Sequence, residues 1–196
     1  ERGVDTLSTY LQKTGDLPLA LFTEEHAFTS AISDSLRKKL QNQVVADETY
    51  HLDDNDLRSV LVRARAKHPK AYYFSCARPN TCAQITNQAR QLGITGQFYS
   101  FLHMSDPDFL NLTRSTANGF RFLATPDDLS QSPEFNKFKE HYLNEYSGSP
   151  KIDFLMRSTY DAANALIRGI EEVGPSPSAV SHYFDSYKTL GALGQI

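Results

Sequence analysis

The sequence contains few cysteines and lacks both long basic blocks and long apolar runs. Its two cysteines, Cys76 and Cys82, permit an oxidising compartment without requiring one. The 20 Lys and Arg residues are outnumbered by 23 Asp and Glu, and they form no Lys/Arg-rich block, which argues against nucleic acid as a partner. No apolar run approaches the ~18 residues that a membrane-spanning helix needs.

Glycine-rich motifs for nucleotide binding are also absent. Neither G-x-x-x-x-G-K-[ST] nor G-x-G-x-x-G occurs, so the backbone nest that holds phosphates is missing, and we expect no cofactor. The nucleophile-elbow motif of α/β hydrolases, G-x-S-x-G, does not occur either.

The length and composition indicate one folded domain or one and a half. The 196 residues are 40% apolar and 22% charged, with no low-complexity tract, which excludes a disordered chain. The first residues, Glu1 to Asp5, resemble neither a signal peptide nor a translation start. We therefore expect the chain to be a piece cut from a longer protein.

Short apolar segments alternate with helical patterns over residues 1–125. Candidate strands begin near Leu17, Val44, Ala71, Gln97 and Phe120, a spacing typical of βα units. Most of these segments are continuously apolar, as in parallel strands covered on both faces. Amphipathic stripes lie between them, and one of these ends at Gly93, a residue suited to the left-handed position after a helix. The pattern predicts an α/β fold with an open parallel sheet in the flavodoxin-like order 2-1-3-4-5 and helices on both faces.

Residues 126–196 form a second segment that reads as helical, with no sheet of its own. The apolar faces of these helices are expected to be buried against another surface. They carry Phe135, Phe138, Tyr142, Leu166, Ile170 and Phe184. They could fold back on the first domain, remain mobile, or bury one another in a homodimer, and we favour the homodimer. The last residues, from Leu190 to Ile196, have the character of a strand start.

Ligands of open parallel sheets bind beyond the carboxyl ends of the strands, where the strand order reverses. Glu24, Glu25 and His26 fall there, and such a group could act as general acid and base in an α/β enzyme. Acidic residues before a helix that begins near Thr29 also favour its positive end, with Thr29 or Ser30 as the cap, and we prefer this interpretation. The acidic run from Asp53 to Asp56 is similarly interpreted as an N-cap.

The loop from Cys76 to Cys82 is the most distinctive segment of the sequence at this edge of the sheet. Arg78 could bind a ligand carboxylate through two hydrogen bonds, or could simply be solvated. The five intervening residues, with Pro79 among them, can bring the two cysteines within bridging distance, so we predict a disulfide. Two free buried thiols are the alternative.

In its order of segments the chain resembles the type I periplasmic binding proteins, especially the branched-chain amino-acid-binding branch and related receptor ligand-binding regions. The segments that carry the resemblance are LPLALFTEEHAFTSAISDSLRKKL, VVADETYHLDDNDLRSVLVRARAKHPKAYYFSC, QARQLGITGQFYS, GFRFLATP, FKEHYLNEYSGSP and STYDAANALIRGIEEVG. Where the family usually has Tyr-Gly, this chain has Phe28-Thr29, which removes a phenolic hydroxyl.

The resemblance implies the second lobe of a two-lobed fold (residues 1–125) followed by helices that adjoin the first lobe (126–196). It implies no enzyme but a periplasmic or extracellular solute-binding component, whose partners are a small amino acid or amide and a membrane transporter. A receptor or sensor-kinase region is the alternative. By position, the implied ligand contacts are Phe28, Cys76, Ala77, Arg78, Ser100, Phe101 and His103.

Overall fold

In the computed structural model the chain divides into two compact units, Glu1–Ala124 and Thr125–Ile196. The structure describes residues 2–101, 104, 106–124, 133–146, 154–192 and 194–195.

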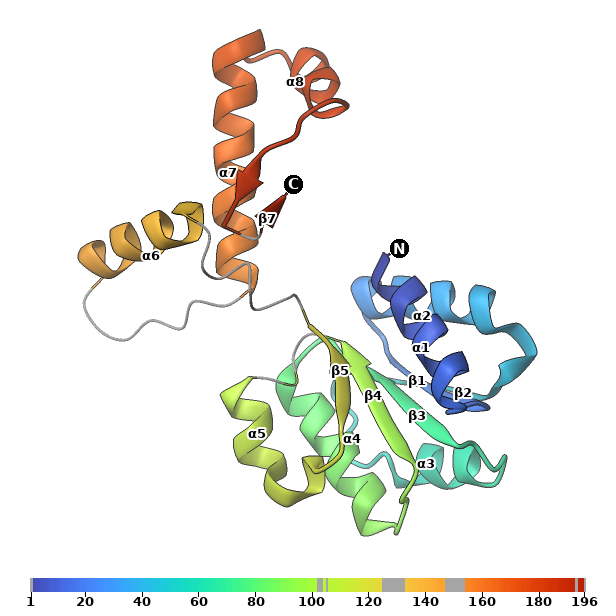
Figure 1. The fold of residues 1–196 in the computed structure, drawn as a ribbon. Helices are drawn as coiled ribbons and strands as arrows, with labels where there is room; N and C mark the ends of the chain where they lie inside the picture. The colour runs from blue at the N-terminus through green and yellow to red at the C-terminus, as the bar shows by residue number, and fades with distance from the viewer. Residues whose placement is uncertain are drawn as a thin grey trace. The chain divides into compact units, whose positions relative to one another are not determined.

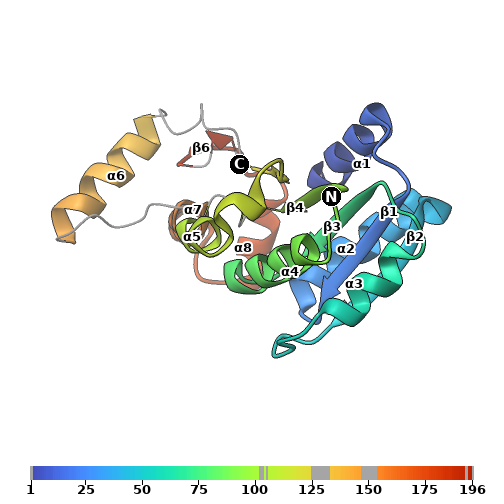
Figure 2. The same cartoon turned by 90° about the horizontal axis from the view of Figure 1, so that it is seen from below.

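The first unit contains a five-stranded sheet in the order β2-β1-β3-β4-β5, with every neighbouring pair parallel (Figure 1). This confirms the α/β class and the strand order predicted from the sequence. Figure 2 shows β1, β3 and β4 side by side in the sheet. The strands are β1 (Leu19–Glu24), β2 (Val44–Tyr50), β3 (Ala71–Ser75), β4 (Gln97–Phe101) and β5 (Arg121–Leu123).

Helices cover both faces of this sheet. α1 (Arg2–Thr14) and α2 (Ala27–Leu40) pack on one face, where Leu11 and Leu36 meet Tyr73 of β3. α3 (Arg58–Arg65), α4 (Pro79–Gln91) and α5 (Pro107–Thr113) pack on the other, around Phe74 and Phe98. Right-handed crossovers produce this division, because the chain moves from β1 to β2 in one direction across the sheet and then to β3, β4 and β5 in the other. Two short 3₁₀ helices, η1 (Gln41–Gln43) and η3 (Arg114–Ala117), complete the unit.

Several element ends differ from the sequence prediction. β1 was expected from Leu17 but begins at Leu19, because Pro18 has no N–H to donate to the sheet. α2 was expected near Thr29 but begins at Ala27, with His26 as its N-cap, since Nδ1 of His26 accepts from the Phe28 N–H at 3.3 Å. The expectation of Thr29 or Ser30 as the cap is therefore wrong.

One predicted helix end agrees with the structure, and one predicted helix start does not. Gly93 follows α4 with a φ of 72°, the left-handed conformation that glycine adopts without strain. Before α3, Oδ1 of Asp56 accepts from the Arg58 N–H at 3.1 Å, and this hydrogen bond lowers the pKa of Asp56. The N-cap of α3 is Leu57, which makes no side-chain capping bond, so the expectation of an N-cap within the acidic run at 53–56 is wrong.

The second unit consists of α6 (Pro133–Glu145), α7 (Phe154–Val173) and α8 (Pro177–Phe184) with two very short strands. β6 (Leu190–Gly191) pairs antiparallel with β7 (Gly194–Gln195), so the expectation of a segment without any sheet is wrong on this point. A run of apolar side chains on the second half of α7 is exposed, namely Leu166, Ile167, Ile170 and Val173. Within the described ranges, no helix has both the length and the apolar character needed to cross a membrane.

Candidate functional site

The carboxyl ends of β1, β3 and β4 meet at one edge of the sheet. They end at Glu24, Ser75 and Phe101. The strand order reverses between β1 and β3, because the chain leaves β1 for one edge of the sheet and returns to β3 on the other side of β1. This is the position at which open α/β sheets bind ligands.

The turn that follows β1 is tied to β3 by buried hydroxyl groups. The Ser75 hydroxyl donates to the carbonyl of Thr29 at 3.1 Å. The Thr29 hydroxyl in turn lies 2.5 Å from the Glu24 carbonyl and 2.7 Å from that of His26. Hydrogen bonds within the chain therefore fix the start of α2 to the end of β3.

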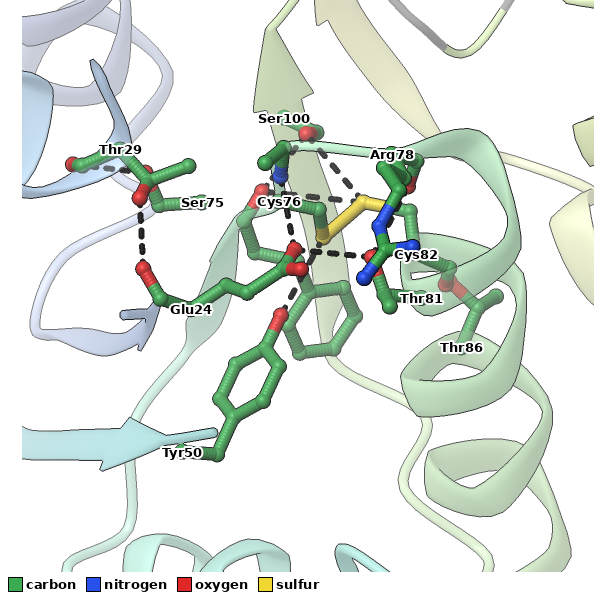
Figure 3. The surroundings of a disulfide bond; sticks show 12 residues. Glu24, Thr29, Tyr50, Ser75, Cys76, Arg78, Thr81, Cys82, Thr86 and Ser100 are labelled. Carbon is green, nitrogen blue, oxygen red and sulfur yellow. Dashed lines mark hydrogen bonds between the residues drawn. A yellow bond between two sulfur atoms is a disulfide. The ribbon is translucent and has the colours of Figure 1, made fainter. Parts of the chain in front are cut away.

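Glu24 is the one acidic side chain of this turn that points into the protein. It has no exposed surface, and its Oε2 accepts from the Ala77 N–H at 2.7 Å and from the Thr81 hydroxyl at 2.8 Å (Figure 3). Its other oxygen, Oε1, is buried and has no hydrogen-bond partner among the described residues. The carboxylate therefore bridges from β1 to the loop after β3.

That loop is closed by a disulfide between Cys76 and Cys82, whose Cα atoms lie 5.5 Å apart. Both cysteines are buried. The Ser100 hydroxyl donates to the Phe74 carbonyl at 2.6 Å. On the other side of the bridge, the Tyr50 hydroxyl lies 3.5 Å from Sγ of Cys76 (Figure 3). Burial, and secondarily the Glu24 carboxylate, raises the pKa of Tyr50, so this side chain is a neutral donor at physiological pH.

An aromatic pair lies beside this edge. Phe28, in the first turn of α2, is 44% exposed, and its ring centre is 6.3 Å from that of Phe101 in an edge-on arrangement. On another side, the Phe101 ring approaches the backbone of α1 so closely that a Cβ on Gly3 would lie 2.8 Å from it. Phe101 is therefore held in place, and Phe28 presents apolar surface.

The residues predicted as ligand contacts occupy different environments. Arg78 is exposed, and its guanidinium has no ion-pair or hydrogen-bond partner in the described part of the chain. Ala77 is partly buried and its N–H is already donated to Glu24. Ser100 is buried, with its hydroxyl engaged by the Phe74 carbonyl. His103 lies outside the described residues.

Glu24, Glu25 and His26, considered above as a general acid and base, do not direct their side chains at one position. Glu24 bonds the loop after β3, whereas the exposed Glu25 pairs with Nδ1 of His51 at 2.7 Å. His26 caps α2 through its own Nδ1. Each side chain has a separate partner, and the described residues contain no group of three or more His, Cys, Asp and Glu that could hold a metal ion.

Sequence analysis missed Tyr50 and Thr81 as members of this site. Thr81 carried a usable signal, because a hydroxyl in the first turn of a helix lies near the ends of the neighbouring strands. Tyr50 carried none, since its role depends on the register that places it opposite Glu24 in the sheet.

Comparison with known proteins places this fold in a family. Residues 1–188 match the family described as periplasmic binding protein. The chain belongs to that family. No curated protein matches it significantly in sequence.

Solved periplasmic binding proteins and related receptors share the fold. A leucine-binding protein from Thermotoga maritima has 23% identity and a TM-score of 0.81, over 98% of this chain and 56% of that one. A branched-chain amino acid transporter substrate-binding protein from Streptococcus pneumoniae, in complex with isoleucine, has 19% identity and a TM-score of 0.74, over 96% and 55%. An extracellular ligand-binding receptor from Desulfohalobium retbaense has 22% identity and a TM-score of 0.78, over 99% and 34%. This periplasmic binding protein chain thus spans about half the length of the first two.

Proposed function

We propose that the chain is the second, ligand-sensing lobe of an extracytoplasmic solute-binding protein, with adjoining helices, and that it binds an amino acid or a similar amide. The observation that carries the proposal is the polar and aromatic edge at the strand-order reversal, in a chain that belongs to the periplasmic binding protein family. The proposal includes no catalysed reaction.

The chemistry of this edge suits an amino acid. The Arg78 guanidinium, exposed and unpaired among the described residues, can hold a carboxylate through two parallel hydrogen bonds. Phe28 offers apolar surface that can cover a ligand side chain. The leucine and isoleucine named for two solved relatives support the same ligand class.

Binding would act by a population shift. A solute that contacts both lobes stabilises the closed form, and a membrane transporter recognises that form in the periplasm or at the cell surface. A receptor would use the same event to signal, and the structural likeness to an extracellular ligand-binding receptor keeps this alternative open.

Isothermal titration with the common L-amino acids and their amides tests the proposal on the chain and on the complete product of its gene. We expect at least one to bind, and the Arg78→Ala variant to weaken that binding about tenfold or more, the effect of losing a charge-assisted hydrogen bond. Leu110→Ala, a change at another exposed position, on α5, is the control and should leave affinity unchanged. Failure of every amino acid and amide to bind either protein would overturn the proposal.

The homodimer stays a prediction. The exposed apolar residues of α7 and Phe184 of α8, which is 40% exposed, supply the surface that such an interface would bury. Sedimentation at micromolar concentration distinguishes a dimer from a monomer.

A further inference from the structure

Glu24 is an unusual side chain to find without solvent exposure. A carboxylate taken out of water costs several kcal/mol unless charged or polar groups compensate for the lost hydration. In this protein the compensation comes from two donors to one oxygen, the Ala77 N–H and the Thr81 hydroxyl, while Oε1 has no partner among the described residues. Such an incomplete arrangement calls for a role beyond stability.

Both donors belong to the start of α4. The N-cap of this 13-residue helix, Arg78, makes no side-chain capping bond, and Pro79 in the first turn has no N–H. The first turn of a helix favours a negative charge, because its N–H groups are unsatisfied and the helix dipole is positive there. Glu24, which comes from 53 positions earlier in the chain than Ala77, supplies from β1 the oxygen that accepts both hydrogen bonds.

The loop that Glu24 bonds is also the loop that carries Arg78. The parallel register pairs Thr23 with Ser75, so the β1–β3 ladder ends just before Cys76. Beyond that point two connections hold the loop: the disulfide fixes Cys76 to α4, and the Glu24 carboxylate fixes the backbone of Ala77. Figure 3 shows the Glu24 carboxylate directed at Thr81, next to the disulfide.

We propose that Glu24 is a positioning residue, whose carboxylate holds the backbone of the loop Cys76–Arg78 so that this loop meets the ligand in one conformation. The proposal rests on the proposed function for the identity of the ligand. It assigns Glu24 neither an acid–base role nor contact with the ligand. In this role the length of the side chain matters more than its charge, because Glu24 acts on the loop through the hydrogen bond that its oxygen accepts from the Ala77 N–H.

Two substitutions distinguish the effect of side-chain length from the effect of charge. Glu24→Gln keeps an oxygen at the same distance from the backbone and removes the charge, whereas Glu24→Asp keeps the charge and shortens the side chain by one methylene. Glu25→Ala, at the adjacent exposed residue, is the matched control. Amide hydrogen exchange at Ala77, compared with a core amide such as that of Leu21, reports the loop separately from the stability of the fold.

We expect Glu24→Asp to speed exchange at Ala77 about tenfold relative to Leu21, the effect of losing one hydrogen bond. Glu24→Gln and Glu25→Ala should stay close to the unsubstituted chain. Equal exchange at Ala77 in the Asp and Gln variants, or protection lost only in the Gln variant, would overturn the proposal.

Titration of L-leucine and L-isoleucine into the same variants connects the loop with binding. Glu24→Asp should weaken affinity about tenfold while Glu24→Gln retains it, and unchanged affinity in both would contradict a role for the loop conformation in binding. If neither amino acid binds any form, the proposed ligand class fails, whereas the exchange experiment still decides whether Glu24 positions the loop.

Discussion

Two tyrosines on neighbouring strands offer a direct test of the hydrogen bonding in the first unit. Tyr73 of β3 and Tyr99 of β4 are register partners and are both buried on the face covered by α1 and α2. The Tyr99 hydroxyl donates to Oδ2 of Asp16 at 2.5 Å and accepts from Arg121 at 3.1 Å. The Tyr73 hydroxyl has no hydrogen-bond partner in the described part of the chain, and burial raises the pKa of Tyr73.

Removing the oxygen should therefore have opposite effects at the two positions. A buried polar group without a partner costs ~1–3 kcal/mol, so Tyr73→Phe should raise the free energy of unfolding by about 1–2 kcal/mol once the lost packing of one atom is subtracted. Tyr99→Phe removes a hydrogen bond to a charged carboxylate and should lower the free energy of unfolding by about 1.5–3 kcal/mol.

Hydrogen exchange of the β3 and β4 amides is the suitable assay. The sequence has no tryptophan to report unfolding of one unit, whereas core amides give the unfolding free energy of the unit that contains them. If Tyr73→Phe destabilises the unit as much as Tyr99→Phe does, then a bound water or another group satisfies the Tyr73 hydroxyl, and the reasoning is refuted.

Three further predictions concern other sites. Gly3→Ala should lower the thermal stability of the first unit by about 1 kcal/mol, because the new Cβ would displace the Phe101 ring; unchanged melting would show that the ring moves freely. Burial raises the pKa of Tyr50 above its unfolded value of about 10, so its contribution to stability should be lost as the pH rises past about 10. Urea unfolding between about pH 8 and 11 should show a smaller loss in Tyr50→Phe than in the unsubstituted chain. Asp161→Ala should speed amide exchange at Ala192 about tenfold or more, since Oδ1 of Asp161 accepts that N–H at 2.7 Å; equal rates would assign the protection to another group.

The parallel βα repeat could be predicted because most of its strands are continuous apolar segments at a regular spacing. Strands buried on both faces need such segments, and the spacing leaves room for one crossover helix between each pair. The ends of the elements were harder to predict, because they depend on single hydrogen bonds. Pro18 delays β1 by removing a donor, and His26 starts α2 earlier by accepting one.

The sequence indicates that Glu24, Glu25 and His26 lie at the end of β1, but not the direction in which each side chain points. Glu24, Glu25 and His26 are adjacent in sequence and therefore suggest one cluster. Glu24 is the last residue of β1, where alternate side chains point to opposite faces, and it follows Ala20 and Phe22 toward the face covered by α3 and α4. The apparent cluster consequently separates into a buried bridge made by Glu24, a surface contact of Glu25 with His51, and a helix cap made by His26.

The partner of Glu24 explains why no sequence pattern could reveal its role. Its acceptor contact is to the N–H of Ala77, a group that every residue except proline possesses, so the identity of the residue at that position carries no signal. What determines the contact is the geometry of β1 and β3, which places the end of one strand beside the first turn after the other. A chain with the same sheet but a longer loop after β3 would lose this backbone donor and leave the buried glutamate with fewer hydrogen bonds. The length of the loop and the acid at the end of β1 therefore have to change together.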